Sequence, residues 1–236
     1  LASKMCRMVD LAQVPSWYNL TPEQQLAQVR QLNGSRNWGF TAADFPSVPE
    51  DFQPRSQTEV LLLAVYLPSR GRDNGLQRTF NELWMLISYP RAGGDWENRY
   101  NAVKPDRGKL QLVEKTGWQP GIRWVAFDPN ASIGKSPRVA LRDATKLGLT
   151  LAHTEVLMAA VLFPKWIGSW YGPLSTYPIM SGLQFKFNDN DEVYTPHMTC
   201  DLGRPSRKGQ LSRIEIFIHP EDVPFVNYGS VFVREC

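Results

Sequence analysis

Cysteine is scarce in this sequence, which holds only Cys6, Cys200 and Cys236 among 236 residues. An odd and sparse set of cysteines does not form the disulfide framework of a small secreted domain, and it favours a reducing cytoplasm. One alternative stays open, a single bridge between Cys6 and Cys236. Long apolar runs are lacking too: the longest, residues 156–163, is too short to cross a bilayer, so no membrane partner is expected.

The chain also lacks a strong excess of either charge. Its 26 Lys and Arg against 23 Asp and Glu give a formal net charge of +3, which permits an anionic partner without requiring one. Apolar residues make up 42% of the chain and charged residues 21%, which is typical of a folded globular protein and excludes wholesale disorder.

Complete catalytic signatures are absent. No Gly-x-Ser-x-Gly occurs, which removes the nucleophile elbow of the hydrolases that use it. Gly134-Lys135-Ser136 resembles the end of a phosphate-binding loop, but Pro129 stands where that loop needs its first glycine. Ser136 followed by Pro137 is better explained as an ordinary helix start, with Ser136 as the N-cap. No cofactor is therefore expected.

One incomplete signature supports an alternative function. His153-Thr154-Glu155 matches the His-x-Glu of zinc deaminases, in which the Glu transfers protons, and His197 and Cys200 could supply the remaining ligands. The long interval between His153 and His197, and the strand-like sequence before Cys200, weigh against this zinc-dependent hydrolase. We therefore expect no metal site, and the catalytic residues, if any exist, are unknown.

Tryptophans beside basic residues suggest a second alternative, a single-stranded nucleic-acid binder. The pairs Arg36/Trp38, Arg123/Trp124 and Lys165/Trp166 could stack bases and neutralise phosphates. We prefer a core role for these rings, because Trp84 and Trp124 fall on core-like patterns.

Patterns along the chain predict a single α+β domain with a mixed or antiparallel sheet and helices packed on it. Residues 1–57 are expected to form an N-terminal arm, a capped helix and a proline-rich connection with Trp38, Phe40, Phe45 and Phe52 as hooks onto the core. Residues 58–236 are expected to form the main domain. Thr21 and Gln24 form a capping box before the first helix, which Gly34 is expected to end. Further helices are predicted over 76–87, after Ser136, and over 151–163, and strands over 110–113, 122–127, 183–187, 193–200, 214–218 and 231–233. Residues 59–67 fit a strand or a helix.

A binding or interaction module is the function that these observations favour, with a protein or an anionic ligand as partner. The expected site is the loop after the 122–127 strand, where the end of a strand meets the start of a helix. Its residues are Asp128, Asn130 and Lys135 in the loop, with Arg123 and Trp124 of the strand leading into it. In the alternative interpretation, Asp128 only caps the turn through its own backbone.

Four segments carry a resemblance: LQRTFNELWMLI (76–87), GIRWVAFDPNASIGKSP (121–137), TEVLMAAVLFPKW (154–166) and the ending SVFVREC (230–236). Together they resemble a family of uncharacterised proteins that recur in candidate-phyla bacteria with reduced genomes. The resemblance implies a bacterial, cytoplasmic, single-domain protein and assigns no catalytic residue. In that family the region around His153 is recognised by its Glu-Val-Leu core rather than by a histidine.

Overall fold

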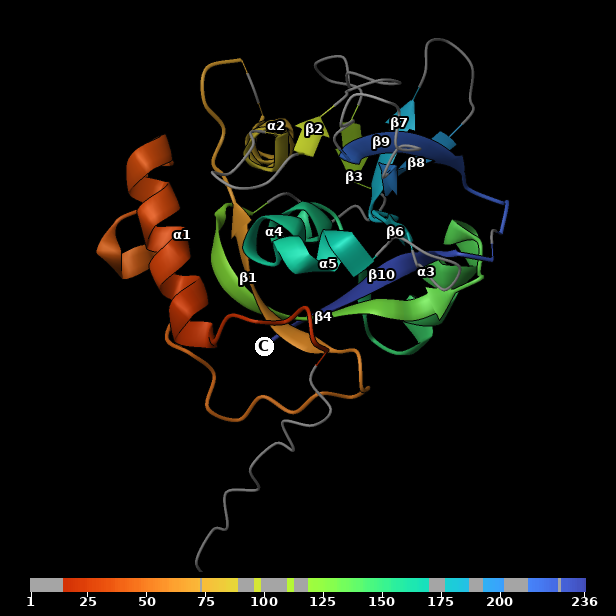
Figure 1. Ribbon diagram of the computed structural model, residues 1–236, viewed down its shortest axis with the longest axis horizontal. Coiled ribbons are helices and arrows are strands. Elements are labelled where there is room, and N and C mark those ends of the chain that lie inside the picture. Colours follow the sequence, from red (N-terminus) through yellow and green to blue (C-terminus); the bar gives the residue numbers. More distant parts are fainter. Residues whose placement is uncertain are drawn as a thin grey trace, which may run out of the picture.

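The computed structural model describes residues 15–72, 74–88, 96–98, 110–112, 119–169, 177–186, 193–201, 212–224 and 226–236. These residues form a mixed α+β structure, as the sequence predicts (Figure 1). The helices are α1 (Pro22–Arg36), a short 3₁₀ turn (Ala42–Asp44), α2 (Gly75–Ser88), α3 (Pro137–Lys146), α4 (Glu155–Leu162) and α5 (Pro164–Ser169). No helix among the described residues is long and apolar enough to cross a membrane.

One sheet joins the strands in the order β1-β4-β10-β6-β8-β7-β3, with β5 beside β10, β9 beside β8 and β2 beside β9. The strands are β1 (Val60–Tyr66), β2 (Trp96–Asn98), β3 (Leu110–Leu112), β4 (Gly121–Ile133), β5 (Thr150–Leu151), β6 (Tyr177–Ile179), β7 (Leu183–Lys186), β8 (Val193–Asp201), β9 (Ser212–Pro220) and β10 (Tyr228–Glu235). Only β10 with β6 and β2 with β9 run parallel, and the other pairs are antiparallel. The ambiguous 59–67 segment is therefore a strand.

The core lies between the β1–β4–β10 part of the sheet and the helices that cover it. Every residue of α4 is buried, and α4 packs on both β1 and α2. Figure 1 shows α4 and α5 in front of β1 and β4, with α1 lying along the β1 side of the sheet. Trp38 is buried, and Phe40, Phe45 and Phe52 pack against the core, which confirms their role as hooks.

The first helix begins as predicted and ends later than predicted. The Thr21 N–H donates to Gln24 Oε1 at 2.8 Å and the Gln24 N–H donates to Thr21 Oγ1 at 3.3 Å, which completes the capping box. Gly34 does not end the helix. The helix continues to Arg36, and its C-cap is Asn37, whose φ of 51° is left-handed. Asn tolerates this conformation better than most residues, so it can replace glycine as a helix stop.

Two predicted boundaries in the centre of the chain are wrong. The helix predicted over 151–163 begins at Glu155, because Leu151 pairs with Phe232 in β10 and the Ala152 N–H donates to the Val231 carbonyl. The strand predicted over 122–127 continues to Ile133, so most of the expected loop is strand. Asp128 pairs with Phe232 and Ser132 with Ser230, so residues 129–131 bulge opposite Val231. Pro129 fits there because a bulge removes the need for its missing N–H.

Candidate functional site

The five residues predicted to bind a ligand have separate structural roles. Trp124 is 3% exposed and belongs to the core. Arg123, next to it on β4, places its guanidinium 4.4 Å from the centre of the Tyr66 ring and pairs with Glu235 at 2.8 Å. Because successive residues of a strand point to opposite faces, these two side chains do not converge on one site.

Asp128 organises the bulge and the segment before β1. Its carboxylate accepts hydrogen bonds from the hydroxyls of Ser56 at 2.7 Å and Thr58 at 2.6 Å, and from the Asn130 N–H at 3.0 Å. The last of these is the Asx turn of the alternative interpretation. Asp128 therefore fastens residues 56–58 to β4.

Lys135 pairs with Asp143 of α3 at 2.8 Å, across the helix start that Ser136 caps. The Ser136 hydroxyl accepts from the Val139 N–H, and Pro137 is the first helical residue, which confirms an ordinary helix start after Gly134. Within the described part of the chain, the Asp128–Asn130 hydrogen bond is the only one found between two of the five predicted residues. The predicted ligand site stays a prediction, without support from their contacts.

A buried polar cluster forms around Glu155 at the start of α4. Its Oε1 accepts from the Tyr66 hydroxyl at 2.6 Å and its Oε2 accepts from the His153 N–H at 2.5 Å. The His153 Nδ1 lies 3.7 Å from Oε1. The His-x-Glu spacing thus brings His153 and Glu155 together, and the fold adds Tyr66 from the end of β1.

His153 and Tyr66 favour the ionised form of the Glu155 carboxyl group. Burial alone raises the pKa of Glu155, but the hydrogen bonding and charge of His153, then the Tyr66 hydroxyl, outweigh burial and lower that pKa below its ordinary value. Burial, followed by the adjacent Glu155 carboxylate, raises the pKa of Tyr66 well above its ordinary value. Glu155 is therefore a buried carboxylate and Tyr66 a neutral donor at neutral pH.

The other proposed zinc ligands lie on β8. His197 pairs with Ile179 of β6, and its ring stands edge-on to Tyr228 with the ring centres 4.8 Å apart. The Cys200 side chain lies outside the described residues. Within the described part of the chain, no group of three or more His, Cys, Asp or Glu side chains has the arrangement of a metal site. The zinc-dependent hydrolase stays an untested alternative.

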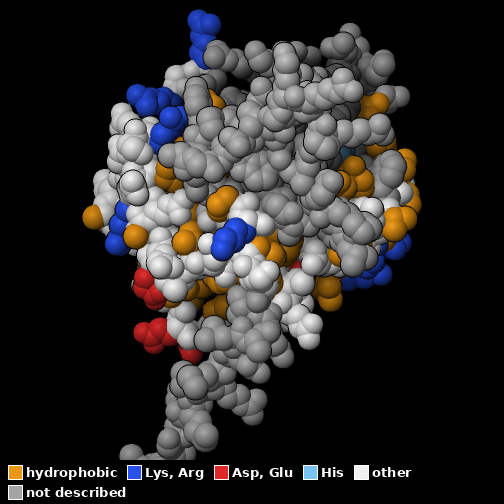
Figure 2. All heavy atoms as spheres, viewed as in Figure 1, with side chains coloured by type: hydrophobic (Ala, Val, Ile, Leu, Met, Phe, Trp, Pro, Cys, Tyr) orange, Lys and Arg blue, Asp and Glu red, His pale blue; other side chains and the backbone are white. Residues whose placement is uncertain are grey.

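The tryptophans expected to stack on bases are core residues. Trp38, Trp124 and Trp166 are all buried, as is Trp84, which confirms the preferred core interpretation for these rings. Figure 2 shows the described Lys and Arg side chains at separate points of one face rather than in a continuous patch. These four buried rings give the nucleic-acid alternative no exposed stacking platform.

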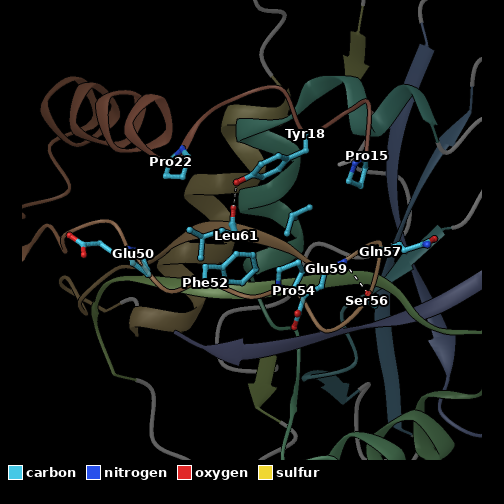
Figure 3. A pocket seen from close by; sticks show the side chains of 12 residues that line it. Pro15, Tyr18, Pro22, Glu50, Phe52, Pro54, Ser56, Gln57, Glu59 and Leu61 are labelled. Carbon is cyan, nitrogen blue, oxygen red and sulfur yellow. Dashed lines mark hydrogen bonds between the residues drawn. The ribbon is translucent and has the colours of Figure 1, made fainter. Parts of the chain in front are cut away.

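A groove that sequence reasoning missed lies between the segment before α1, the 49–57 connection and β1. It encloses about 310 Å³. Its apolar wall is formed by Tyr18, Phe52 and Leu61 with Pro15, Pro22 and Pro54, and Figure 3 shows Tyr18 and Phe52 on either side of Leu61. Glu50, Ser56 and Glu59 are among the polar residues that line it. The signal in the sequence was the clustering of Pro49, Phe52 and Pro54 in one loop, interpreted there only as core anchoring.

Hydrogen bonds hold the groove walls in place. The Tyr18 hydroxyl donates to the Leu61 carbonyl at 2.7 Å, and burial raises the pKa of Tyr18 to about 12, so this hydroxyl is neutral. Ser56 Oγ accepts from the Glu59 N–H at 3.0 Å. The Glu59 carboxylate faces Arg234 at 3.4 Å, which directs its charge away from the groove.

Comparison of the chain with protein-family models, with curated proteins and with solved structures finds no match. The resemblance to the reduced-genome bacterial family therefore stays a prediction, and function has to be argued from the site alone.

Proposed function

We propose that this protein is a binding module whose ligand site is the groove between residues 15–22, residues 49–57 and β1. The ligand presents an apolar group to the groove and a positive charge beside it. The groove itself is the observation that supports this proposal, because it is an open apolar hollow with walls fixed by hydrogen bonds. The scarcity of cysteine supports a cytoplasmic location as part of the same proposal.

The size of the groove suits one side chain or a comparably small apolar group. Ligand pockets in proteins usually enclose roughly 300–1,000 Å³, and this groove is at the lower end of that range. Full burial of a group the size of a Leu or Phe side chain is worth roughly 1.5–3 kcal/mol. The groove alone therefore supports weak binding, and a natural ligand gains the rest of its affinity from contacts outside it.

Charge near the groove favours a cation. Glu50 lines it, and Figure 3 shows its carboxylate turned away from the apolar side chains, toward the outside. The exposed Asp51 follows Glu50, and the exposed Glu23 follows the groove residue Pro22. Two cations oppose these charges: Arg55, beside Pro54, and Arg234, which pairs with Glu59. The aromatic faces of Tyr18 and Phe52 also attract cations.

Three probes with one carbon skeleton test this proposal: phenylbutylamine, phenylbutanol and phenylbutyrate. We expect each to shift NMR resonances of the groove residues in a titration, with affinity falling from the amine through the alcohol to the carboxylate. Small ligands of this kind bind at best in the millimolar to high-micromolar range. A failure of all three probes to shift groove resonances would reject the site, and equal affinities would reject the preference for a cation.

Matched variants locate the effect. Phe52→Ala removes a groove wall and should weaken phenylbutylamine binding by about tenfold, because it removes much of the apolar contact. Phe45→Ala is the control, since Phe45 also packs against the core but does not line the groove. Glu50→Gln should bring phenylbutylamine close to the affinity of phenylbutanol without changing the latter.

A further inference from the structure

Strand β1 is paired on one side only within the described residues. Its partner is β4, in a register that runs from Val60 opposite Phe127 to Tyr66 opposite Gly121. At its other edge, the N–H and C=O of every second residue point away from β4, among them the Leu61 C=O and the Leu63 N–H. An edge of this kind is a template for a further extended chain.

Gln25 of α1 occupies part of this edge in the manner of a peptide group. Its Nε2 donates to the Leu61 C=O at 3.0 Å and its Oε1 accepts from the Leu63 N–H at 3.0 Å. The side chain is completely buried. One carboxamide therefore binds the acceptor of residue 61 and the donor of residue 63, as one residue of a parallel strand would.

The same pair of groups recurs one step earlier, at the groove. The alternation of β1 turns the Leu61 N–H toward the edge that Gln25 uses, and the same alternation continued one residue before β1 turns the Glu59 C=O that way. Glu59, Val60 and Leu61 all line the groove. Outside the pairing of β1 with β4, no described residue donates a hydrogen bond to the Glu59 C=O, and none accepts one from the Leu61 N–H.

We infer that the groove takes an extended peptide segment, which adds to the β1 edge with one residue opposite Val60. That residue donates its N–H to the Glu59 C=O and accepts from the Leu61 N–H, and an apolar side chain of the segment lies beside Phe52. The next residue lies beyond the paired position, where the segment is no longer held as a strand, so a Lys or Arg there turns back to meet Glu50. This inference rests on the proposed function and names its ligand class.

Existing hydrogen bonds set the direction of the segment. An antiparallel partner opposite Leu61 would need the Leu61 C=O as acceptor, but Tyr18 and Gln25 already donate to that oxygen. A parallel partner opposite Val60 needs only the two groups that face the groove. The segment therefore runs in the same direction as β1, and its register ends where Gln25 begins.

The test uses acetyl-Phe-Lys-amide and the same peptide with a methyl group on the Phe nitrogen. Both carry the apolar ring and the positive charge, but only the first can donate to the Glu59 C=O. We expect the unmethylated peptide to bind about fivefold more tightly, the value of one net hydrogen bond. It should also move the Leu61 amide proton downfield and slow its exchange with water, whereas phenylbutylamine should do neither.

The outcomes separate the two proposals. If phenylbutylamine shifts groove resonances while the peptides bind equally and leave Leu61 exchange unchanged, the strand-addition inference is wrong and the groove stays a ligand site. If neither phenylbutylamine nor either peptide shifts groove resonances, both proposals fail. Loss of peptide binding in Phe52→Ala but not in Phe45→Ala would confirm that the peptide uses the groove.

Discussion

The two ends of strand β1 carry opposite kinds of environment. At one end Tyr66 meets Glu155 and His153 in a buried polar cluster, whose carboxylate oxygens both accept hydrogen bonds from within the chain. At the other end Glu59, Val60 and Leu61 line an apolar groove. His153 and Glu155, which suggest catalysis in the sequence, thus bind to groups of the chain itself, and the proposed ligand site lies among apolar residues.

This difference follows from the cost of burying polar groups. A buried carboxylate is stable only when it accepts hydrogen bonds, and the Tyr66 hydroxyl and the His153 N–H donate to Glu155. Backbone groups beside an open groove can remain in contact with water until a ligand replaces it. Three sets of variants test whether the cluster is structural in this sense and whether the groove depends on its own supports.

The largest expected effect comes from Glu155→Ala. It leaves the Tyr66 hydroxyl and the His153 N–H without their acceptor in the core, so we expect a loss of roughly 3 kcal/mol or more in the free energy of unfolding. Urea denaturation measures it. Glu50→Gln is the exposed control and should change stability little. A Glu155→Ala protein as stable as the parent would show that the cluster does not hold β1 to α4.

A pH titration of Glu155→Gln gives an independent measurement of the same cluster. The pKa of Glu155 is lowered on folding, so its contribution to stability is present above the unfolded pKa of about 4.3 and is lost as the pH falls through the folded pKa. The free energy of unfolding of the variant should therefore fall less steeply than that of the parent as the pH is lowered. Parallel stability curves for parent and variant below about pH 4 would contradict the lowered pKa.

Gly182→Ala should have the next largest effect. A Cβ at this position would stand 2.5 Å from both His153 Cδ2 and the Leu151 carbonyl oxygen, so the 151–153 segment would have to move. We expect a loss of roughly 2 kcal/mol, measured by denaturation. Gly34→Ala in α1 is the matched control, because nothing lies within 4 Å of its added Cβ, and it should stabilise by about 0.5–1 kcal/mol. Equal changes in the two variants would refute the close approach at Gly182.

Asp128→Ala should lower stability less than Glu155→Ala and Gly182→Ala, and it reports on the groove. It removes the acceptor of the Ser56 and Thr58 hydroxyls, for a loss of about 1 kcal/mol. Because Ser56 also holds the Glu59 N–H, phenylbutylamine binding should weaken as well. Lys135→Ala loses only an exposed ion pair and should change stability by less than about 0.5 kcal/mol, with unchanged binding. A stronger effect of Lys135→Ala on binding would instead restore the predicted loop as the ligand site.

Local patterns predicted much of the fold. Three features depend on residues within a few positions of each other, and each appears in the structure: the Thr21 capping box, the Ser136-Pro137 helix start and the helix predicted over 76–87. The two errors in the centre of the chain came from distant partners, whereas the wrong end of the first helix had a local cause, the left-handed Asn37. Leu151 became a strand residue because Phe232 pairs with it, and β4 passed through Pro129 because β10 offers a single residue opposite three.

The candidate site was predicted only in part. The His-x-Glu spacing correctly placed His153 beside Glu155, since both lie at one helix start, but Tyr66 is 89 positions away and no local pattern could identify it. The groove combines three segments whose approach depends on Tyr18 and Gln25 bonding to β1. Such bonds join residues 36–43 positions apart and leave no periodic trace in the sequence.

The sequence by itself determined the α+β fold class and most helix starts, and it lacks a complete catalytic signature of the kinds considered above. These properties depend on composition and on short-range spacing. Tertiary structure alone decided which partners the polar groups of Glu155, Asp128 and Gln25 have. The physical reason is that a hydrogen-bonding group acquires its role from the partner that burial brings to it. That partner is set by the packing of the whole domain.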